Sequence, residues 1–228
     1  MFTPLRKTLG NVRLYIALQK SIGADRIRYR CLEEAELKPG ERLLDLGCGP
    51  AYYFGRLPEV DYVGFDTSEA YVAYARQHYG KRGDFRCESF TAQHIAQLGQ
   101  FDVILLFGVL HHLDDAQCAT LLDLSARALK PGGRVVSNDP TLHDGQRRVS
   151  RWMSQNDRGG YVRRPESYER MARASFGEVE TQLIDAVTRV PTSTHIMRMA
   201  VPLVPAAELV HRAGGVSITS GRVSPSPG

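Results

Sequence analysis

An apolar segment that runs directly into two closely spaced glycines constrains this chain more than any other feature. One acid, Asp45, lies within the otherwise apolar stretch 43–46, and Gly47-Cys48-Gly49 follows at once. This pattern predicts a buried strand that ends in a tight glycine loop. Glycines allow left-handed backbone and the close approach of a ligand, and a helix that follows such a loop offers free N–H groups. The loop is therefore the first candidate binding site.

Strand and helix patterns alternate along the chain after a clear stop at 38–40. Strands are predicted at 42–46, 61–65, 84–87, 101–107 and 134–138, and helices after Pro50 and at 67–79, 91–98, 114–129 and 165–174. Two final strands, paired with each other, are predicted at 179–186 and 195–200. Strict alternation with short turns indicates a doubly wound α/β sheet.

The chain is expected to form one domain of ordinary size with an extension at each end. Its 228 residues are 43% apolar and 24% charged, which is typical of a globular protein. An amphipathic pattern broken at Gly23 predicts two helices within 1–36, packed on a core domain at 37–200. Residues 201–228 are rich in proline, glycine and serine and are predicted to be mostly disordered.

The composition favours a reducing compartment, and we expect a cytoplasmic protein. The four cysteines are scattered without a C-x-x-C pair, which argues against a zinc knuckle and a disulfide framework. No membrane insertion or secretory signal is expected, because the apolar run 103–110 is far shorter than the roughly 20 residues that a bilayer needs. The net charge of +4 does not by itself require a nucleic acid partner.

Asp66 is the second candidate binding residue, because it follows the predicted strand 61–65 and lies 19 residues after Gly47. One turn, one helix and one strand fill that interval, so the chain returns beside the glycine loop. A carboxylate there can accept both ribose hydroxyls of an adenosine. The alternative is that Asp66 caps the next helix, whose start is expected at Thr67 or Ser68. The spacing from the loop favours ribose binding.

Four segments together resemble the signature motifs of class I S-adenosylmethionine-dependent methyltransferases. These segments are Asp45–Pro50, Val63–Asp66, Phe101–Leu113 and Ala128–Gly133. The resemblance is firm over 35–140 and is closest to the small-molecule branch found in quinone and natural-product pathways. It implies a Rossmann-like, doubly wound α/β fold with a seven-stranded sheet of order 3-2-1-4-5-7-6, strand 7 antiparallel, and N-terminal helices.

The glycine spacing also separates two classes of ligand. A dinucleotide site requires G-x-G-x-x-G, and the third glycine position is occupied here by Tyr52. S-adenosylmethionine carries no phosphate, so its loop requires only Gly47 and Gly49 with an acid ahead of them. We therefore expect S-adenosylmethionine as the cofactor.

The resemblance implies roles for the residues that would hold this cofactor. Asp45 would steady the loop and, through water, the methionine ammonium, to which Phe107 would offer its carbonyl. The family usually places an acid on the adenine amino group, but the aligned residue here is Ser89, between Glu88 and Phe90. Either polar side chain could make this contact, or Phe90 through its backbone and ring. The predicted cofactor set is Asp45, Gly47, Gly49, Asp66, Thr67, Glu88, Ser89, Phe90 and Phe107.

Two adjacent histidines follow the predicted fourth strand, near the place where an acceptor would lie. Methyl transfer from a sulfonium depends mainly on alignment, and a base is needed only when the nucleophile retains a proton. His111 or His112 could be that base; the alternative is that one is packed and the other is bonded to backbone. No metal site is expected, since Asp114-Asp115 is typical of a helix cap.

The arginine-rich stretch 140–164 is expected to cover the substrate entrance. Arginine guanidinium groups bind carboxylate or phosphate through two parallel hydrogen bonds and would favour an anionic small molecule. The alternative is that these arginines form a solvated surface with ion pairs. The side chains predicted to reach the acceptor, each of which could equally be structural, are Asp139, Arg158, Tyr161 and His195.

The predicted function is methyl transfer to an oxygen, carbon or nitrogen atom of a small molecule. RNA methylation is one alternative, because arginines bind phosphate. Nucleic acid is disfavoured, since 107–110 lacks the Asn/Asp-Pro-Pro-aromatic run common in base and amide N-methylases of this fold. The other alternative is a cofactor-binding scaffold, or a cyclase of the same fold that transfers no methyl group.

Overall fold

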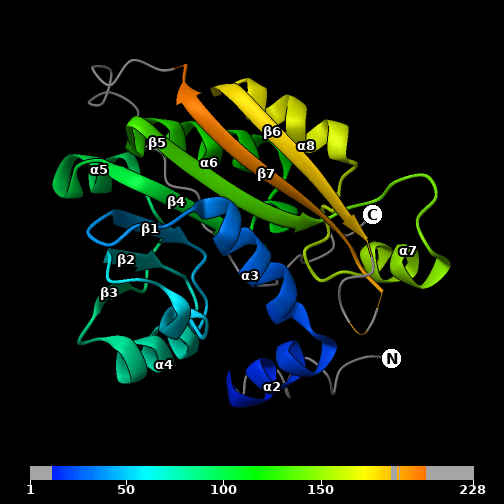
Figure 1. The fold of residues 1–228 in the computed structure, drawn as a ribbon, viewed down its shortest axis with the longest axis horizontal. Helices are drawn as coiled ribbons and strands as arrows, with labels where there is room; N and C mark the ends of the chain where they lie inside the picture. Colours follow the sequence, from blue (N-terminus) through cyan, green and yellow to red (C-terminus); the bar gives the residue numbers. More distant parts are fainter. Residues whose placement is uncertain (1–11, 186–188, 190, 204–228) are drawn as a thin grey trace, which may run out of the picture.

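A single seven-stranded sheet forms the centre of the protein. The computed structural model describes residues 12–185, 189 and 191–203 (Figure 1). Its strand order is β3-β2-β1-β4-β5-β7-β6, with β1 to β5 parallel and β7 antiparallel to both of its neighbours, which confirms the predicted topology. The strands are β1 (Arg42–Leu46), β2 (Asp61–Phe65), β3 (Gly83–Arg86), β4 (Phe101–Phe107), β5 (Leu129–Pro140), β6 (Phe176–Asp185) and β7 (Ser193–Pro202).

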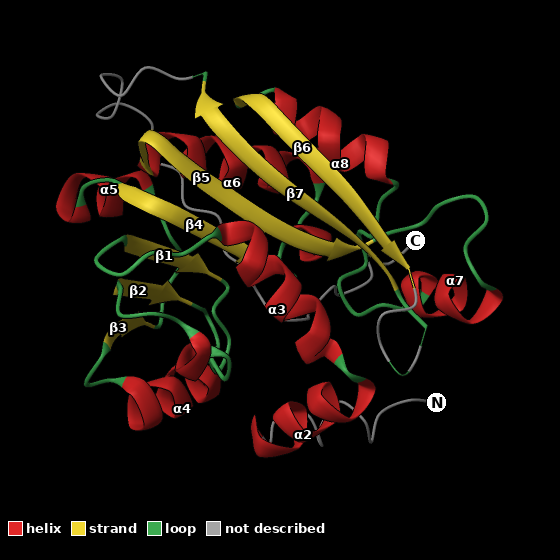
Figure 2. Ribbon diagram, viewed as in Figure 1, coloured by secondary structure: helices red, strands yellow, loops and turns green. Residues whose placement is uncertain are grey.

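Helices cover both faces of the sheet, with α5, α6 and α8 on one side and α3 and α4 on the other (Figure 2). The α-helices are α2 (Val12–Ile22), α3 (Ala24–Ala35), α4 (Glu69–Tyr79), α5 (Ala92–Leu98), α6 (Asp115–Ala128), α7 (Arg148–Gln155) and α8 (Pro165–Arg173). Short 3-10 turns are η1 (Phe54–Arg56) and η2 (Leu110–His112). The helices pack on the faces of the sheet, so the loops that follow the parallel strands lie together at the carboxyl edge of the sheet.

Several elements differ from the sequence prediction in kind or in length. The helix expected after Pro50 is only the turn η1, because Ala51 takes a left-handed φ of +48° and interrupts any regular helix there. Conversely, α7 forms within the stretch 140–164, where no helix was predicted. Strand β7 extends to Pro202, two residues into the segment expected to be disordered. Leu203 is also described, and 204–228 lie outside the described residues.

Consecutive residues of the central strands point into two separate cores. Leu44 and Ile104 pack under α5, α6 and α8, whereas Leu43 and Val103 pack under α3 and α4. Each fully buried side chain of this size contributes about 1.5–3 kcal/mol through the hydrophobic effect. Burial on both faces explains why apolar residues follow one another along the central strands instead of alternating with polar ones.

The N-terminal helices are attached to the sheet through Arg134 on β5. Its guanidinium is 8% exposed and donates to the carbonyl of Glu36 (2.7 Å) and to the Glu41 carboxylate (2.9 and 3.0 Å). Helix α3 adds Ile27 and Cys31 to the core beside β1 and β4. The helices expected within 1–36 therefore pack on the core over the part that the structure describes.

Candidate functional site

The glycine loop lies at the carboxyl ends of β1 and β2 and is tied to both. The backbone N–H groups of Gly47 and Cys48 donate to the carbonyl of Phe65 (2.8 and 3.0 Å). The N–H of Gly49 donates to Oδ2 of Asp66 (2.8 Å). The two predicted binding elements are thus adjacent, as their spacing in the sequence indicated.

The two glycines are required for different physical reasons. Both have left-handed backbone, with φ of +76° at Gly47 and +55° at Gly49. A Cβ on Gly47 would lie 2.6 Å from Cγ2 of Val109, so this glycine allows a close approach to the chain after β4. A Cβ on Gly49 would have no described atom within 4 Å. The expectation that both glycines make room for the cofactor is therefore corrected: Gly49 faces open space, whereas Gly47 faces Val109.

Asp66 uses both carboxylate oxygens to order the loop and the start of α4. Oδ2 holds Gly49, and Oδ1 accepts the backbone N–H of Ser68 (2.8 Å), the residue that precedes α4. Asp66 thus holds the N-cap residue Ser68, whose own side chain makes no capping hydrogen bond. Burial raises the pKa of Asp66, and each oxygen retains a second lone pair. Ribose binding remains compatible with this geometry and stays a prediction.

Asp45 is a completely buried acid with one unsatisfied oxygen. Its Oδ2 accepts hydrogen bonds from the hydroxyls of Tyr53 and Tyr62, the latter at 2.6 Å. Its Oδ1 has no hydrogen-bond partner among the described residues. Burial raises the pKa of Asp45 to about 6. An unpaired buried acceptor costs about 1–3 kcal/mol, so a donor group on a ligand or a water beside the loop would be stabilised here.

The predicted cofactor residues after β3 lie in three different environments. The Glu88 carboxylate is half exposed and lies 3.4 Å from Nε2 of His94. Ser89 is partly exposed. The ring of Phe90 is 1% exposed and packs against Phe65 and His94. This corrects the expectation of a ring contact with adenine and leaves the Phe90 backbone for that contact.

His111 is held between two carboxylates. Its Nδ1 lies 2.7 Å from Oδ1 of Asp139, which also accepts the backbone N–H of His111 (3.0 Å), and its Nε2 lies 3.2 Å from Oδ1 of Asp157. Burial by itself would lower the pKa of His111, but the hydrogen bonds with Asp139 and Asp157 outweigh it and raise the pKa to about 9. At neutral pH this ring is a cation with both nitrogens occupied, so the structure argues against His111 as the base.

His112 differs from its neighbour in charge. The two imidazole rings lie 4.1 Å apart. Burial and, next, the positive charge of His111 lower the pKa of His112 to about 4. At neutral pH, the raised pKa keeps His111 protonated and the lowered pKa keeps His112 neutral. The predicted histidine pair therefore separates into a structural cation and a neutral ring that can accept a proton.

The residues predicted to contact the methyl acceptor fall into two groups. Near the histidines, Asp139 is 2% exposed with Oδ2 unpaired among the described residues, and the backbone N–H of Tyr161 donates to the carbonyl of His111 (3.0 Å). Arg158 is exposed and forms no ion pair with a described residue. His195, by contrast, is 3% exposed and stacks on Tyr168 inside the fold. This environment favours the structural alternative for His195.

Several arginines of the stretch 140–164 are engaged in local ion pairs. Arg163 contacts Asp115 (2.7 Å) and donates to two carbonyls of the η2 region, and Arg164 contacts Asp144 (2.8 Å). For these side chains the ion-pair alternative is correct. Asp115 is thereby explained without a metal ion, and Asp114 caps α6, as predicted, by accepting the N–H of Gln117 (2.8 Å).

Neither a metal centre nor a membrane-spanning helix is present among the described residues. No three or more His, Cys, Asp or Glu side chains converge on a point that could hold a metal ion. Among the same residues, none of the helices combines the length and apolar character needed to cross a bilayer.

Arg28 on α3 is a candidate that sequence reasoning missed. Its guanidinium hydrogen-bonds the Tyr52 hydroxyl, lies 4.7 Å from the centroid of that ring, and donates to Gln19 (3.3 Å). It also contributes a favourable positive field at Asp45. Arg28 is brought to the glycine loop by the packing of α3 on the sheet, so no local pattern could have identified it.

The charge of His111 predicts a dependence of stability on pH. Its folded pKa of about 9 exceeds the ordinary value of 6.5. The stabilisation is therefore fully present below about pH 6.5 and is lost as the pH rises through about 9. We expect His111→Gln to lower the Tm near pH 6 and to converge with the unmodified protein near pH 10, measured by thermal unfolding across this range. The exposed His78→Gln is the control, and a constant Tm difference for His111→Gln would contradict the assignment.

Comparisons with known proteins agree with this geometry. A family model for a methyltransferase domain matches residues 43–133. The ubiquinone biosynthesis O-methyltransferase of Pseudomonas aeruginosa strain UCBPP-PA14 is 32% identical over 116 residues, which make up 48% of this chain and 48% of that protein. The chain thus matches about half the length of that relative.

Solved structures share the fold at low sequence identity. The N-methyltransferase NodS from Bradyrhizobium japonicum WM9, in complex with S-adenosyl-L-homocysteine, is 18% identical with a TM-score of 0.62, over 79% of this chain and 89% of that one. The [4+2]-cyclase SpnF is 18% identical with a TM-score of 0.61, over 78% and 82% of the two chains. Residues 43–133 thus match a methyltransferase domain, and the sheet topology and the glycine loop of the chain are similar to those of class I S-adenosylmethionine-dependent methyltransferases.

Proposed function

We propose that this protein transfers the methyl group of S-adenosylmethionine to an oxygen, carbon or nitrogen atom of a small-molecule acceptor. The observation that carries the proposal is the cradle at the carboxyl ends of β1 and β2. There Gly49 faces open space, Asp66 lies beside it, and Asp45 has a buried unpaired oxygen. The names of the relatives, an O-methyltransferase and an N-methyltransferase, support small-molecule chemistry of this kind.

The residues of this cradle match the chemical groups of the cofactor. Asp66 would accept the ribose hydroxyls with the lone pairs that its backbone bonds leave free. Asp45 and the carbonyl of Phe107 would stabilise the methionine ammonium, and the Arg28 guanidinium would pair with the methionine carboxylate. The adenine would lie beside the backbone of Phe90 and the polar side chains of Glu88 and Ser89. When bound, the cofactor supplies a methyl group on a sulfonium, which is already electrophilic.

His112 is the residue that we propose as the proton acceptor. Its lowered pKa keeps the ring unprotonated throughout the neutral pH range and also makes it a weak base. It would therefore accept a proton from an O–H or N–H group that becomes acidic as the bond to the methyl group forms. His111 would act as a positioning residue, because its bonds to Asp139 and Asp157 fix the chain that bears His112. Alignment of the nucleophile with the methyl group would supply most of the acceleration.

Arg158 supports an acceptor with negative charge. It is exposed and forms no ion pair with the described residues. Its charge adds to the lowering of the pKa of His112, which is caused mainly by burial, and it partly offsets the burial that raises the pKa of Tyr71. Arg158 is therefore close enough to both rings to attract a carboxylate, phosphate or phenolate on the acceptor.

The proposal is tested by calorimetry followed by turnover. We expect micromolar affinity for S-adenosylmethionine and S-adenosylhomocysteine, and release of S-adenosylhomocysteine only when an acceptor is present. With an acceptor that must lose a proton, His112→Ala should lower kcat about a hundredfold or more and leave the affinity for S-adenosylhomocysteine unchanged. His78→Ala, at an exposed histidine, should leave both quantities unchanged.

Two other outcomes would replace the proposal. A folded protein that binds neither compound would refute the cradle. Tight binding without release of S-adenosylhomocysteine, across oxygen, carbon and nitrogen acceptors, would favour a scaffold or a cyclase. The structural likeness to the cyclase SpnF is the specific reason for retaining that second candidate. RNA methylation has less support, because Arg163 and Arg164 are already paired with acids.

A further inference from the structure

Helix α7 buries polar side chains and exposes apolar ones, which is the reverse of the usual arrangement of a surface helix. Its hydroxyl side chains Ser150 and Ser154 are 3% and 5% exposed, whereas Val149 and Trp152 are 55% and 64% exposed. A surface helix normally buries its apolar stripe and leaves its polar side chains in water. Clustered apolar side chains that stay in water mark surfaces of interaction. The outer face of α7 therefore requires an explanation beyond the packing of the domain.

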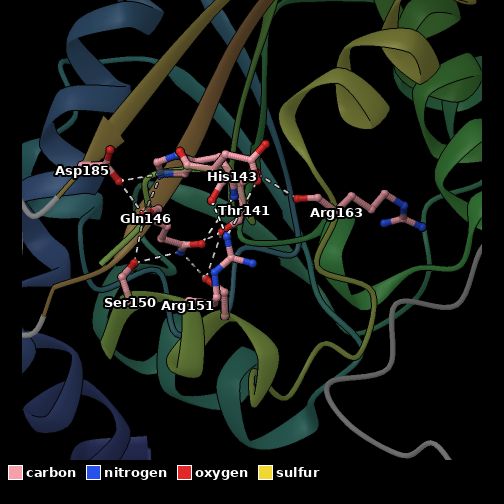
Figure 3. A network of polar contacts seen from close by, with 10 residues as sticks. Thr141, His143, Gln146, Ser150, Arg151, Arg163 and Asp185 are labelled. Carbon is pink, nitrogen blue, oxygen red and sulfur yellow. Dashed lines mark hydrogen bonds and ion pairs between the residues drawn. The ribbon is translucent and has the colours of Figure 1, made fainter. Parts of the chain in front are cut away.

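A buried hydrogen-bond network fixes this orientation (Figure 3). The amide Nε2 of Gln146 donates to the carbonyl of Thr141 (3.1 Å) and to the hydroxyls of Ser150 (2.9 Å) and Ser154 (3.2 Å). Ser150 in turn lies 2.9 Å from the hydroxyl of Ser193 at the start of β7. Rotating α7 to bury Trp152 would leave several of these buried groups unpaired, at about 1–3 kcal/mol each.

Further contacts from the segment before α7 strengthen its attachment. Nε2 of His143 lies 3.0 Å from the Asp185 carboxylate at the end of β6, and Arg151 donates to the carbonyl of His143 (2.8 Å). The helix lies beyond the carboxyl end of β5, at the edge of the molecule (Figure 1). Its inner side is thus rigidly held by polar bonds, and its outer side presents Val149 and Trp152.

The charge around these two apolar side chains is positive. Residues 145–156 contain three arginines and no Asp or Glu. Arg147 and Arg148 are exposed and form no ion pair with the described residues, whereas Arg151 lies 4.0 Å from Asp144. The outer face of α7 therefore combines a tryptophan and a valine with two available guanidinium groups.

We propose that the outer face of α7, made of Arg147, Arg148, Val149 and Trp152, docks on an anionic lipid surface. Tryptophan is favoured where an apolar body meets a polar boundary, and arginine pairs with lipid phosphates. A stable protein interface needs about 800 Å² from each partner, which two apolar side chains on a helix of eight residues do not offer. Lipid docking needs only shallow entry of these side chains and no membrane-spanning segment.

Docking at α7 would place the candidate site next to the lipid surface. Asp157, two residues beyond the end of α7, contacts His111 through Nε2 (3.2 Å), and the backbone of Tyr161 bonds the His111 carbonyl. The segment that follows the docking face is therefore the one that packs on the histidine pair. The inference concerns this face alone and does not depend on methyl transfer.

Trp152 provides a direct test, because it is the only tryptophan in the chain. The full chain is mixed with phosphatidylcholine vesicles that contain or lack phosphatidylglycerol. With the anionic vesicles we expect a blue shift of tryptophan emission and co-sedimentation of the protein, both weakened by added salt. With neutral vesicles both signals should be much smaller.

Paired variants separate the face from the rest of the surface. V149S/W152S should lower vesicle affinity about tenfold or more, whereas Leu183→Ser, at another exposed apolar side chain, should not. R147Q/R148Q should weaken binding to anionic vesicles, whereas K81Q/R170Q removes two exposed charges elsewhere and should have little effect. Circular dichroism and S-adenosylhomocysteine affinity show that each variant is folded.

Three results would overturn the proposal. The first is unchanged Trp152 emission, with no co-sedimentation, at saturating anionic lipid. The second is vesicle binding that V149S/W152S does not reduce, which would place the contact elsewhere. The third is a lipid-free dimer, detected by light scattering and abolished by W152S, which would make this face an interface between copies. Because turnover is not a readout here, these results are independent of the proposed methyl transfer.

Discussion

Asp139→Ala is expected to destabilise the protein by about 3–5 kcal/mol, the usual cost of removing one partner of a buried charge pair. Asp139 is 2% exposed, and a single oxygen accepts both the Nδ1–H and the backbone N–H of His111. Without it, a buried imidazolium would retain only Asp157, and the pKa of His111 would fall. Urea denaturation at neutral pH measures the loss in the free energy of unfolding.

Asp144→Ala is the matched control for this variant. Asp144 also pairs with a cation, Arg164 (2.8 Å), but its side chain is 85% exposed, so water and salt screen the pair. We expect little change in the free energy of unfolding. Equal losses in the free energy of unfolding for Asp139→Ala and Asp144→Ala would show that the buried pair stabilises the protein no more than an exposed one.

Asp66→Ala is expected to weaken the binding of S-adenosylhomocysteine by about 1–3 kcal/mol, roughly 5- to 150-fold, the cost of losing a charged hydrogen-bond partner. The variant removes the acceptor for Gly49 and Ser68, and with it the proposed ribose contact. Calorimetry on the folded variant measures the affinity. Asp66→Asn, which retains one oxygen acceptor, should lose less.

Asp61→Ala tests whether this effect belongs to the site. Asp61 lies at the opposite end of the same strand, where it pairs with Arg42 at the surface (2.9 Å). Its removal should leave the affinity for S-adenosylhomocysteine unchanged. Unchanged affinity in Asp66→Ala as well would refute both the ribose contact and the role of Asp66 in shaping the loop.

The glycine loop and the order of the strands could be predicted because their causes are local or periodic. A parallel strand covered on both faces is apolar along most of its length, so the run 103–107 identified β4 without reference to the rest of the chain. The left-handed backbone at Gly47 and Gly49 likewise explains the glycine pattern. The interval from Gly47 to Asp66 correctly placed the acid beside the loop.

The reason for each glycine could not be predicted, because it depends on what the fold brings near it. Val109 reaches Gly47 only through the pairing of β1 with β4. The same limit applies to Phe90, whose ring is taken into the core by Phe65 and His94. A local pattern identifies a loop but does not identify its neighbours.

By itself, the sequence determined the sheet, the glycine loop and the position of Asp66, because strand periodicity, backbone conformation and chain length are properties of contiguous residues. Only the tertiary structure decided the charge of the histidines. Two identical side chains differ because Asp139 from β5 and Asp157 from the segment after α7 converge on His111 and not on His112. It also decided which side of α7 is exposed, since Thr141 and Ser193 bind its serines and leave Trp152 in water. Both outcomes depend on groups distant in the sequence, and the pKa of a side chain and the burial of a helix face follow from such neighbours.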